Sequence, residues 1–315
     1  MRLTVTRAGP AAQDIRRIEL RHAGGGPLPA FAPGAHLKFK LVLPGGHATV
    51  REYSLVGAPE ARERYEIAVL REPAGSGGSA AMHALAVGDT LEAEGPANEF
   101  PLAEGAREHL LIAGGIGITP ILCMARALAA RGEPMQLHYA ARSAQRMAYR
   151  EEAAALPGAT LYCDEGDPSR GMPLDAILAN PGEARHLYVC GPRGLIAGVL
   201  DRAAAHGWPN DRVHYESFNG AVALSNDRPI RLVLRASGRT LEVAADQSIL
   251  DALIEAGLDP LHDCRRGECG MCMTPVLEGT PDHRDHALSA RERAEGKVIC
   301  TCVSRSLTPE LVLDL

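Results

Sequence analysis

Three cysteines lie within nine residues of one another near the C-terminal end of the chain, in the stretch CRRGECGMC. They are Cys264, Cys269 and Cys272, with the spacing C-x4-C-x2-C. Thiolates are soft ligands that bind zinc or iron–sulfur clusters. Clustered cysteines in a chain without a visible export signal are more often metal ligands or catalytic groups than parts of a disulfide framework. The stretch therefore predicts a metal centre.

The spacing favours a [2Fe-2S] cluster over zinc. C-x4-C-x2-C is the spacing of plant-type [2Fe-2S] sites, whose fourth cysteine lies far along the chain, whereas zinc sites more often pair two C-x2-C knuckles. Gly267 and Gly270 suit a tight loop around a cluster, since a side chain there would block close approach or an unusual φ. The fourth ligand is then Cys300 or Cys302 in ICTCV. Alternation along a strand puts both on the same face, so periodicity leaves this choice open.

Residues 228–315 resemble a plant-type ferredoxin domain, in which the last ligand follows a Thr or similar residue and precedes a Val. Cys302 in TCVSR fits that pattern, at C-x29-C from Cys272. The resemblance implies that Cys302 is the fourth cluster ligand and that Cys300 is a buried neighbour.

The stretch REYSL, at residues 51–55, combines three side chains suited to a flat, phosphorylated cofactor. Arg51 can bond a phosphate bidentately, Tyr53 can stack on a ring, and the Ser54 hydroxyl can reach a ring nitrogen. Taken alone, these letters are equally typical of an edge strand with an exposed Arg. Downstream, GSGGSAAMHAL places glycines before a helix expected to start near Ser79, where free N–H groups favour a phosphate. Together the two stretches predict a flavin site.

The stretch AGGIGITP, at residues 113–120, follows one predicted strand and opens a predicted helix, with Pro120 near its first turn and Gly132 where a C-terminal cap is expected. It is not the G-x-G-x-x-G fingerprint. Its glycines nevertheless allow close approach, and the helix start favours a pyrophosphate. Later, VCGP places Cys190, Gly191 and Pro192 at the end of another strand. Alone, VCGP indicates a strand end and a turn, but the two motifs in order on one α/β segment favour a dinucleotide site.

These motifs, in this order, resemble the ferredoxin–NADP reductase superfamily. The resemblance implies that Ser54 lies near flavin atom N5, and that Cys190 and Glu216 lie at the nicotinamide. The remaining flavin contacts that it implies are Arg51, Tyr53, Val69, Gly78, Ser79 and Phe218. The remaining dinucleotide contacts are Gly115, Gly117, Thr119, Pro120, Gly191 and Pro192. The residues alone show only that Glu216 and Phe218 follow a strand, a position more often found in a core.

Three successive patterns describe the elements that must position these motifs. Residues 1–103 contain short alternating strands separated by Gly and Pro, which predicts an antiparallel β-barrel. Residues 104–222 alternate strands and helices, which predicts a parallel α/β sheet. Residues 228–315 combine a hairpin, a capped helix ending at Gly257, the cysteine loop and the strand-like runs KVICTCV and ELVLDL. By resemblance this last part is an α+β ferredoxin domain of the β-grasp type, joined by a linker at about 219–229.

The order of flavin, nicotinamide and C-terminal ferredoxin parts resembles the phthalate dioxygenase reductase family over nearly the whole chain. The resemblance implies an oxidoreductase that passes electrons from NADH through FMN and a [2Fe-2S] cluster to the Rieske centre of a separate oxygenase. That oxygenase would dihydroxylate or demethylate an aromatic or small organic substrate. FMN is favoured because relatives with the ferredoxin part first use FAD. The alternatives are the same electron chain feeding a haem–thiolate monooxygenase, and a redox sensor or zinc-stabilised module without hydride chemistry.

The choice between NADH and NADPH rests on ARSAQRMAYREE, which follows the second strand of the nicotinamide domain. An acid at this position favours a free ribose 2′-OH, while Arg favours a 2′-phosphate. Arg142, Ser143 and Arg146 occupy the stretch, which indicates tolerance of NADPH, whereas the family resemblance favours NADH. NADH is the predicted donor, with NADPH as the alternative.

Composition narrows the class of protein further. The chain has 315 residues, 46% of them hydrophobic, and a net charge of −6, which argues against nucleic-acid binding. It has no apolar run of about 18 residues that would span a membrane, and no secretory signal is visible. We therefore expect a cytoplasmic enzyme without nucleic-acid or membrane partners. Cys123 and Cys163 are expected in the core.

Overall fold

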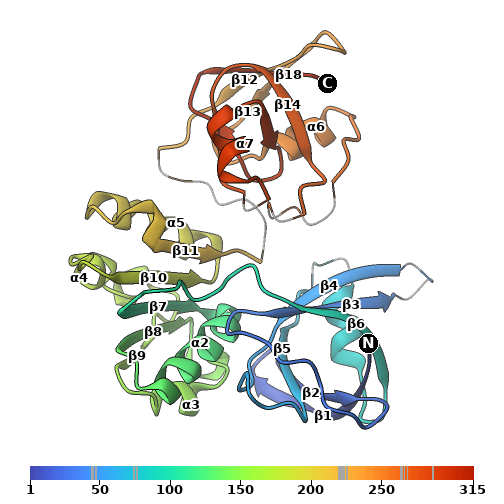
Figure 1. Cartoon of the computed structure of the whole chain (residues 1–315), viewed down its shortest axis with the longest axis vertical. Helices are drawn as coiled ribbons and strands as arrows, with labels where there is room; N and C mark the ends of the chain where they lie inside the picture. Colours follow the sequence, from blue (N-terminus) through green and yellow to red (C-terminus); the bar gives the residue numbers. More distant parts are fainter. Residues whose placement is uncertain are drawn as a thin grey trace. The chain divides into compact units, whose positions relative to one another are not determined.

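The computed structural model describes residues 1–43, 46, 48–73, 75, 77–218, 224, 226–262, 265, 267, 269–285 and 287–315. The chain forms two compact units. The first contains Met1–Gly191 with Arg202–Glu216, and the second contains Pro192–Asp201 with Ser217–Leu315. In Figure 1 the blue and green segments therefore belong to the first unit, and the orange and red segments to the second.

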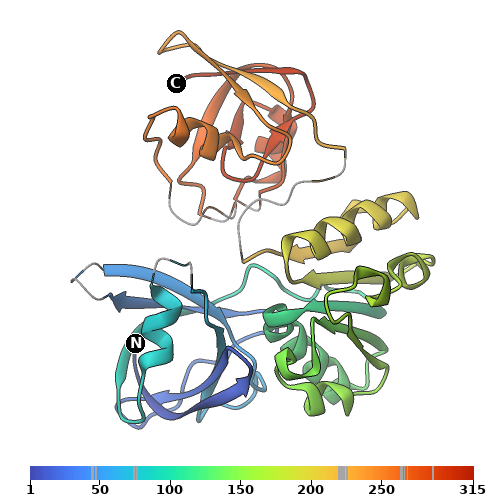
Figure 2. The same ribbon diagram turned by 180° about the vertical axis from the view of Figure 1, so that it is seen from behind.

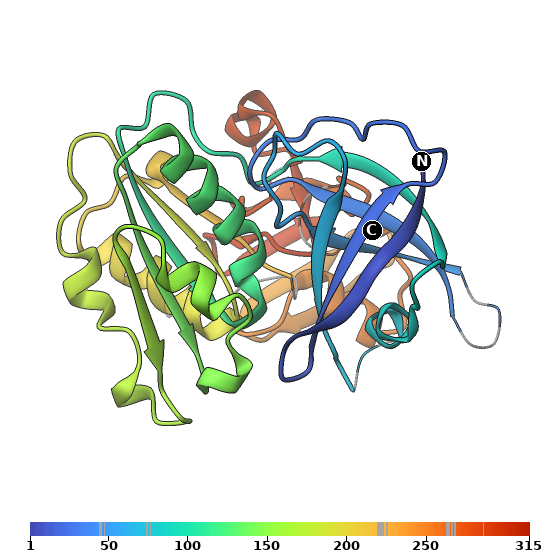
Figure 3. The ribbon, with the colours of Figure 1, turned by 90° about the horizontal axis from the view of Figure 1, so that it is seen from below.

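The N-terminal part of the first unit is a six-stranded antiparallel sheet with the strand order β4-β3-β6-β1-β2-β5. Its strands are β1 (Arg2–Ala12), β2 (Ile15–His22), β3 (His36–Val42), β4 (Ala48–Ser54), β5 (Tyr65–Leu70) and β6 (Thr90–Ala97). A bridge between Leu55 and Ile67 joins the end of β4 to β5, so that the sheet closes on itself. Leu3, Phe39 and Ile67 are fully buried in the core of this sheet, around which the blue strands curve in Figure 3. The predicted β-barrel is confirmed.

The rest of the first unit is built on a five-stranded parallel sheet with the order β11-β10-β7-β8-β9. Its strands are β7 (Glu108–Gly114), β8 (Met135–Ala141), β9 (Ala159–Cys163), β10 (Arg185–Cys190) and β11 (Val213–Glu216). Six consecutive residues of β7, His109–Gly114, are buried, as expected for a strand covered on both faces. The predicted parallel α/β sheet is confirmed.

Helix α2 (Ile118–Arg131) packs on β7, β8 and β10. Pro120 lies in its first turn, where a missing N–H costs nothing, and Gly132 ends it in the left-handed conformation with φ 67°. Both residues were predicted to mark the ends of this helix. The further helices of this part of the chain are α3 (Arg150–Ala154), α4 (Leu174–Leu178) and α5 (Arg193–Ala205).

The C-terminal part of the second unit is built on a five-stranded mixed sheet with the order β13-β12-β18-β14-β16. Its strands are β12 (Ile230–Leu234), β13 (Arg239–Val243), β14 (Met273–Glu278), β16 (Val298–Cys300) and β18 (Glu310–Leu313), beside a short pair formed by β15 (Pro281–Asp282) and β17 (Arg305–Ser306). Strands β12 and β18 run parallel, and the other neighbours run antiparallel.

Two short helices complete this α+β domain, which Figure 2 shows from behind. Helix α6 (Ile249–Glu255) begins at Ser248, whose Oγ accepts a hydrogen bond from the Asp251 N–H at 3.0 Å. Its residues Ile249 and Leu253 pack into the core of the sheet. Helix α7 (Ala290–Glu295) begins with a capping box formed by Ser289 and Glu292. The predicted ferredoxin-type fold is confirmed.

One expected strand is shorter than the sequence suggested. The run KVICTCV forms a strand only over Val298–Cys300, because the N–H groups of Val303 and Ser304 turn back to the Cys300 carbonyl, at 3.4 and 3.0 Å. Cys302 therefore lies in a turn, and strand alternation does not relate it to Cys300.

None of the helices in the described part of the chain is both long and apolar enough to cross a membrane.

Candidate active site and cluster site

Strand β4 presents the predicted flavin residues. It pairs with β3, so that Tyr53 lies opposite Leu37 and Ser54 opposite His36. The Tyr53 ring packs against Phe39 with 6.0 Å between ring centroids. Burial raises the pKa of Tyr53 to about 12, so its hydroxyl stays neutral and its ring remains an apolar surface. Ser54 is buried at the end of the strand.

The two halves of the predicted phosphate site lie against each other. The side chain of Arg51 covers Gly78, the first residue of α1 (Gly78–Ala84), because a Cβ built on Gly78 would lie 2.7 Å from Arg51 Nε. Arg51 Nη1 donates to Thr49 Oγ1 and to the Val50 carbonyl, both at 2.6 Å. A side chain at position 78 would displace the Arg51 side chain from its place beside the first turn of this helix. The structure thus brings REYSL and GSGGS together.

The turn before α1 is held by Ser79 and glycine. Ser79 Oγ accepts a hydrogen bond from the Glu72 N–H at 3.0 Å, and Gly77 has a φ of 94°. The Ser79 hydroxyl thereby shapes the loop that leads into the helix. Val69, on β5, is buried, as expected for a residue that lines an apolar ring site.

The predicted dinucleotide motifs meet at the carboxyl ends of neighbouring strands. From β7 the chain adds β8 and β9 on one side of the sheet and then returns to add β10 and β11 on the other. Ligands of open α/β sheets bind at such a point of reversal. Here the glycine loop and VCGP face each other, since a Cβ on Gly117 would lie 2.3 Å from the Cys190 carbonyl oxygen. Gly117 is therefore required for this close approach.

Gly115 and Thr119 shape the same loop. Gly115 has a φ of 53°, in the left-handed region that favours glycine. Thr119 is buried, and its hydroxyl donates to the Ile116 carbonyl at 3.0 Å. Pro120 follows it in the first turn of α2.

Cys190 and Glu216 lie side by side at the ends of β10 and β11. They are register partners, and Cys190 Sγ approaches Glu216 Oε2 at 3.9 Å. Both residues are buried. Burial raises the pKa of the Cys190 thiol well above its ordinary value, and the nearby Glu216 carboxylate raises it further. Cys190 is therefore a neutral thiol at physiological pH, which supports a positioning role over a nucleophilic one.

Helix α2 also contacts the segment that follows REYSL. Cys123 Sγ donates to the Gly57 carbonyl at 3.3 Å, and Arg126 Nη1 donates to the Val56 carbonyl at 2.7 Å. The helix that begins at the glycine loop thus lies directly against the flavin domain. Sequence reasoning placed Cys123 in the core, where it is, but was wrong for Cys163, which is only half-buried at the end of β9. It also missed Arg126, because no motif marks a side chain that bonds a backbone carbonyl.

The residues expected to read the adenosine ribose differ in their surroundings. Arg142 is exposed just beyond the end of β8. Arg146 Nη2 forms an ion pair with Asp14 Oδ2 at 3.1 Å, and Gln13 N donates to the Gln145 carbonyl at 2.8 Å. Arg146 is thereby tied to the β1–β2 turn, whereas Arg142 extends into solvent.

The cysteine site brings distant thiols together. Cys272 and Cys302 are both buried, with 3.2 Å between their Sγ atoms. Cys269 is exposed, and its sulfur accepts a hydrogen bond from the Met271 N–H at 3.5 Å. Hydrogen bonds from the backbone to sulfur are among the features by which a protein sets the reduction potential of an iron–sulfur cluster. Cys264, the remaining predicted ligand, lies outside the described residues.

Glycines leave room for the loop that carries these thiols. Gly267 and Gly270 have φ values of 80° and 71°. A Cβ on Gly267 would lie 2.6 Å from Val303 Cγ2 and 2.9 Å from Asp285 Cα. The residues present therefore fit a [2Fe-2S] cluster, with soft donors on a tightly wrapped loop.

Three family models match the chain. An oxidoreductase FAD-binding domain matches residues 3–101, the N-terminal domain of dimethylamine monooxygenase subunit DmmA-like proteins matches residues 91–213, and a 2Fe-2S iron-sulfur cluster binding domain matches residues 233–307.

Curated relatives match the chain over almost its full length. It is 43% identical over 309 residues to a vanillate O-demethylase oxidoreductase of Pseudomonas sp. (strain HR199 / DSM 7063), covering 96% of each chain. It is 37% identical over 321 residues to the phthalate dioxygenase reductase of Burkholderia cepacia, covering 100% of this chain and 97% of the relative. This chain belongs to the phthalate dioxygenase reductase family. A solved phthalate dioxygenase reductase is 38% identical, with a TM-score of 0.69, and the match covers 100% of this chain and 98% of that one.

As a member of the phthalate dioxygenase reductase family, the chain is an NADH-dependent oxidoreductase with FMN and a [2Fe-2S] cluster as its cofactors. It is the reductase component of an oxygenase system. A self-sufficient cytochrome P450 monooxygenase is 39% identical with a TM-score of 0.70, and the match covers 100% of this chain but 41% of that one. A segment similar to this whole chain therefore also occurs as part of a longer protein.

Proposed function

We propose that the partner of this reductase is a separate terminal oxygenase with a Rieske centre, acting on an aromatic substrate. The observation that carries the proposal is full-length similarity to reductases of vanillate O-demethylase, at 43% and 44% identity over 96% of each chain. A relative at 40% identity is the reductase subunit of a phthalate 4,5-dioxygenase. Demethylation or dihydroxylation of an aromatic acid is the proposed reaction of the partner. The thiol-rich cluster site supports a cytoplasmic location, where cysteines remain reduced.

We assign the flavin site to residues of the barrel. Arg51, Gly78 and Ser79 hold the phosphate, since the Arg51 side chain and the first turn of α1 lie together. Tyr53 and Val69 provide apolar surface for the ring, and Ser54 lies at its reactive edge. Phe218, which belongs to the second unit, is proposed as the residue that covers the flavin. The domain boundaries 1–103, 104–222 and 228–315 are part of the same proposal.

We assign the dinucleotide site to the ends of β7, β10 and β11. The glycine loop admits the pyrophosphate, and Cys190 and Glu216 orient the nicotinamide. The other residues that we assign to the dinucleotide site are Gly115, Gly117, Thr119, Pro120, Gly191 and Pro192. We place Arg142 beside the adenosine ribose. Cys264, Cys269, Cys272 and Cys302 are the proposed cluster ligands.

The bound flavin supplies the chemistry that links a two-electron hydride donor to the one-electron carrier in the cluster. The protein contributes by positioning. Because Gly117 has no side chain, α2 approaches β10 closely, and the dinucleotide loop lies directly against Cys190. Cys190 remains neutral because it is buried beside Glu216, and it therefore presents a small, uncharged surface to the nicotinamide. Arg126 and Cys123, both on α2, bond this helix to the flavin domain.

The proposal is tested by anaerobic titration of the purified holoprotein with NADH, followed by addition of a purified vanillate or phthalate oxygenase. We expect bleaching of both flavin and iron–sulfur absorbance, and then NADH-dependent product formation by the oxygenase. A cluster that bleaches without reducing either Rieske oxygenase would refute the partner assignment. A cluster that does not bleach would refute the electron path itself.

A haem-containing partner is the second candidate. One relative, at 41% identity over 289 residues, is the heme-dependent oxidative N-demethylase beta subunit of Ectopseudomonas mendocina (strain ymp). Side-by-side rates of reduction of a Rieske oxygenase and of a haem demethylase subunit separate the two candidates. Faster reduction of the haem protein would favour this second one.

A further inference from the structure

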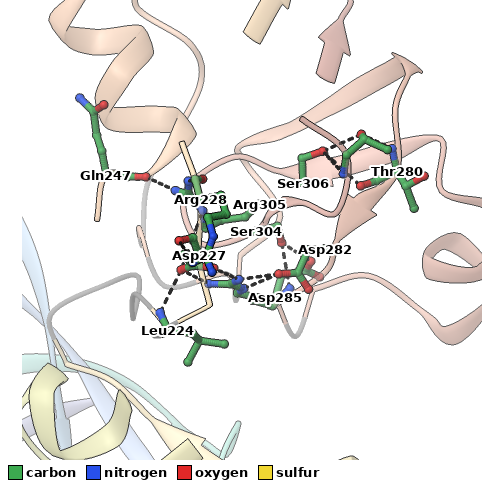
Figure 4. A network of polar contacts seen from close by, with 12 residues as sticks. Leu224, Asp227, Arg228, Gln247, Thr280, Asp282, Asp285, Ser304, Arg305 and Ser306 are labelled. Atoms are coloured by element: carbon green, nitrogen blue, oxygen red, sulfur yellow. Dashed lines mark hydrogen bonds and ion pairs between the residues drawn. The ribbon is translucent and has the colours of Figure 1, made fainter. Parts of the chain in front are cut away.

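We propose that Asp227 is a positioning residue for electron transfer into the cluster, because it ties the end of the interdomain linker to the two loops that hold the cysteines. The inference rests on the proposed electron path from flavin to cluster. Figure 4 shows Asp227 at the centre of a network of polar contacts that also includes Arg305, Ser304 and Asp285.

The centre of the network is a buried ion pair. Arg284 donates to both carboxylate oxygens of Asp227, with 2.9 Å between Nη1 and Oδ2. The Asp227 side chain is 5% exposed and that of Arg284 is 11% exposed. A second guanidinium, that of Arg305, lies 3.9 Å from Asp227 Oδ2. A pair this deeply buried is little screened by solvent. Arg284 Nε also donates to Asp282 Oδ2 at 2.8 Å, so the loss of Asp227 leaves Arg284 with one carboxylate partner in place of two.

The backbone of the linker is bonded into the same network. The Leu224 N–H donates to Asp227 Oδ2 at 2.9 Å. Arg305 Nη2 donates to the Arg228 carbonyl at 2.9 Å and to the Ala244 carbonyl at 3.1 Å, and its Nη1 donates to the Gln247 carbonyl. The residues around Asp227 are therefore joined to the ferredoxin domain through both side-chain and main-chain atoms.

The other side of the network reaches the cysteine loops. The Arg284 N–H donates to Ser304 Oγ at 3.1 Å, and this hydroxyl donates to Asp285 Oδ1 at 3.0 Å. Ser304 lies two residues after Cys302, and its N–H donates to the Cys300 carbonyl at 3.0 Å.

The same loop also contacts the first cysteine segment. The Ala287 N–H donates to the Gly267 carbonyl at 3.0 Å. Gly267 stands between Cys264 and Cys269 in the sequence. Hydrogen bonds from Arg284, which pairs with Asp227, and from Ala287 therefore reach both segments that carry cluster ligands.

Two consequences follow for electron transfer. Residues 226–228 cannot act as a free hinge, because their position is determined by the loops around the cluster. Residues 226–228 and the cluster site consequently move as one body, and we infer that the approach of the cluster to the flavin depends on this anchor. Electron transfer needs accurate positioning of donor and acceptor, which small displacements far from the chemistry can disturb.

The test uses the holoenzyme with Asp227→Asn, which keeps the shape of the side chain and removes its charge. Stopped-flow mixing with NADH under anaerobic conditions reports flavin reduction and cluster reduction separately. We expect unchanged flavin reduction, unchanged iron and sulfide content and an unchanged EPR spectrum of the reduced cluster. Cluster reduction should slow by about tenfold, a moderate cost for displaced redox partners.

Glu310→Gln is the matched control, because it breaks an exposed ion pair of the same domain, between Arg231 Nη1 and Glu310 Oε2 at 2.9 Å. It should leave every rate unchanged. Combining Asp227→Asn with Arg284→Gln should slow cluster reduction by less than the product of the two single effects, since both changes remove the Asp227–Arg284 pair while each also removes a contact of its own, with Arg305 or with Asp282.

The inference would be overturned by equal rates of cluster reduction in Asp227→Asn and wild type, or by fully additive effects of the two changes in the double variant. Loss of the cluster from Asp227→Asn would also overturn it, because it would indicate a purely structural role. Failure of the wild type to reduce its cluster with NADH would instead refute the proposed electron path.

Discussion

The sulfur atoms of Cys272 and Cys302 lie 3.2 Å apart, although 29 residues separate them in the sequence. Hydrogen bonds from Cys300 and Cys302 lower the pKa of the Cys272 thiol, which favours the thiolate form that binds iron. Strand β14 begins directly after Cys272, and β16 ends at Cys300. The pairing of these two strands places Met273 opposite Cys300. The sheet therefore brings the thiols together.

Replacing Cys302 by Ser should abolish the cluster, because Cys302 is the proposed fourth ligand. Replacing the equally buried Cys300 by Ser is the matched control and should retain it. Iron and acid-labile sulfide analysis of the two purified variants provides the measurement. Retention of the cluster in Cys302→Ser together with its loss in Cys300→Ser would reverse the assignment.

Gly267→Ala should strongly destabilise the ferredoxin domain. Its Cβ would overlap Val303 and the backbone of Asp285 at a φ of 80°, so we expect a cost of about 3 kcal/mol from strain and overpacking together. Gly238→Ala has a similar φ of 66° but meets nothing within 4 Å, and should cost only about 1 kcal/mol. Denaturant unfolding, followed by the loss of iron–sulfur absorbance, compares the two. Equal unfolding midpoints of the two variants would mean that the loop around Gly267 relaxes to admit the new methyl group.

Reduction of the flavin by NADH should not depend on ionisation of Cys190. Burial and the Glu216 carboxylate raise its pKa well above the ordinary value, so the thiol stays neutral over the range from about pH 6 to about pH 8.5. The rate in wild type and in Cys190→Ala should follow the same pH profile, at a lower level in the variant. A rise in rate near pH 8.5 that Cys190→Ala abolishes would instead indicate a working thiolate.

The same pKa predicts how Cys190 affects stability. Because the pKa of the thiol is raised in the folded state, its contribution to the free energy of unfolding is complete below the pKa that it has in the unfolded chain, about 8.5. This contribution decreases as the pH rises from there towards the pKa of the folded state. Unfolding midpoints of wild type should therefore fall more steeply above that pH than those of Cys190→Ala.

Arg142→Ala should reduce the use of NADPH more than the use of NADH. Arg142 is exposed beyond β8, where it can meet a ribose 2′-phosphate. Loss of a charge-assisted hydrogen bond of about 1.5 kcal/mol corresponds to roughly tenfold in kcat/KM for NADPH. Arg146→Ala is the control, because Arg146 is paired with Asp14. An equal loss with both coenzymes would exclude a role in selectivity.

Much of this protein was predictable from local sequence. Periodicity and turn residues predicted the barrel, the parallel sheet and the ends of α2, because Pro120 and Gly132 act on the chain within a single turn. Cysteine spacing predicted the cluster loop for the same reason, since three ligands in nine residues must share one loop. The glycines of AGGIGITP likewise indicated close backbone approach before any partner was known.

What approaches those glycines was decided by tertiary structure. Gly117 lies against Cys190 and Gly78 lies under Arg51 because pairing between distant strands and packing of helices set these distances. The expected strand through Cys302 was wrong beyond Cys300, since a turn held by the Cys300 carbonyl ends it. Arg126 and Asp227 carry no motif at all, and their partners, Val56 and Arg284, lie 70 and 57 residues away. Local patterns determined the elements and the types of ligand, and long-range packing alone decided which residues meet.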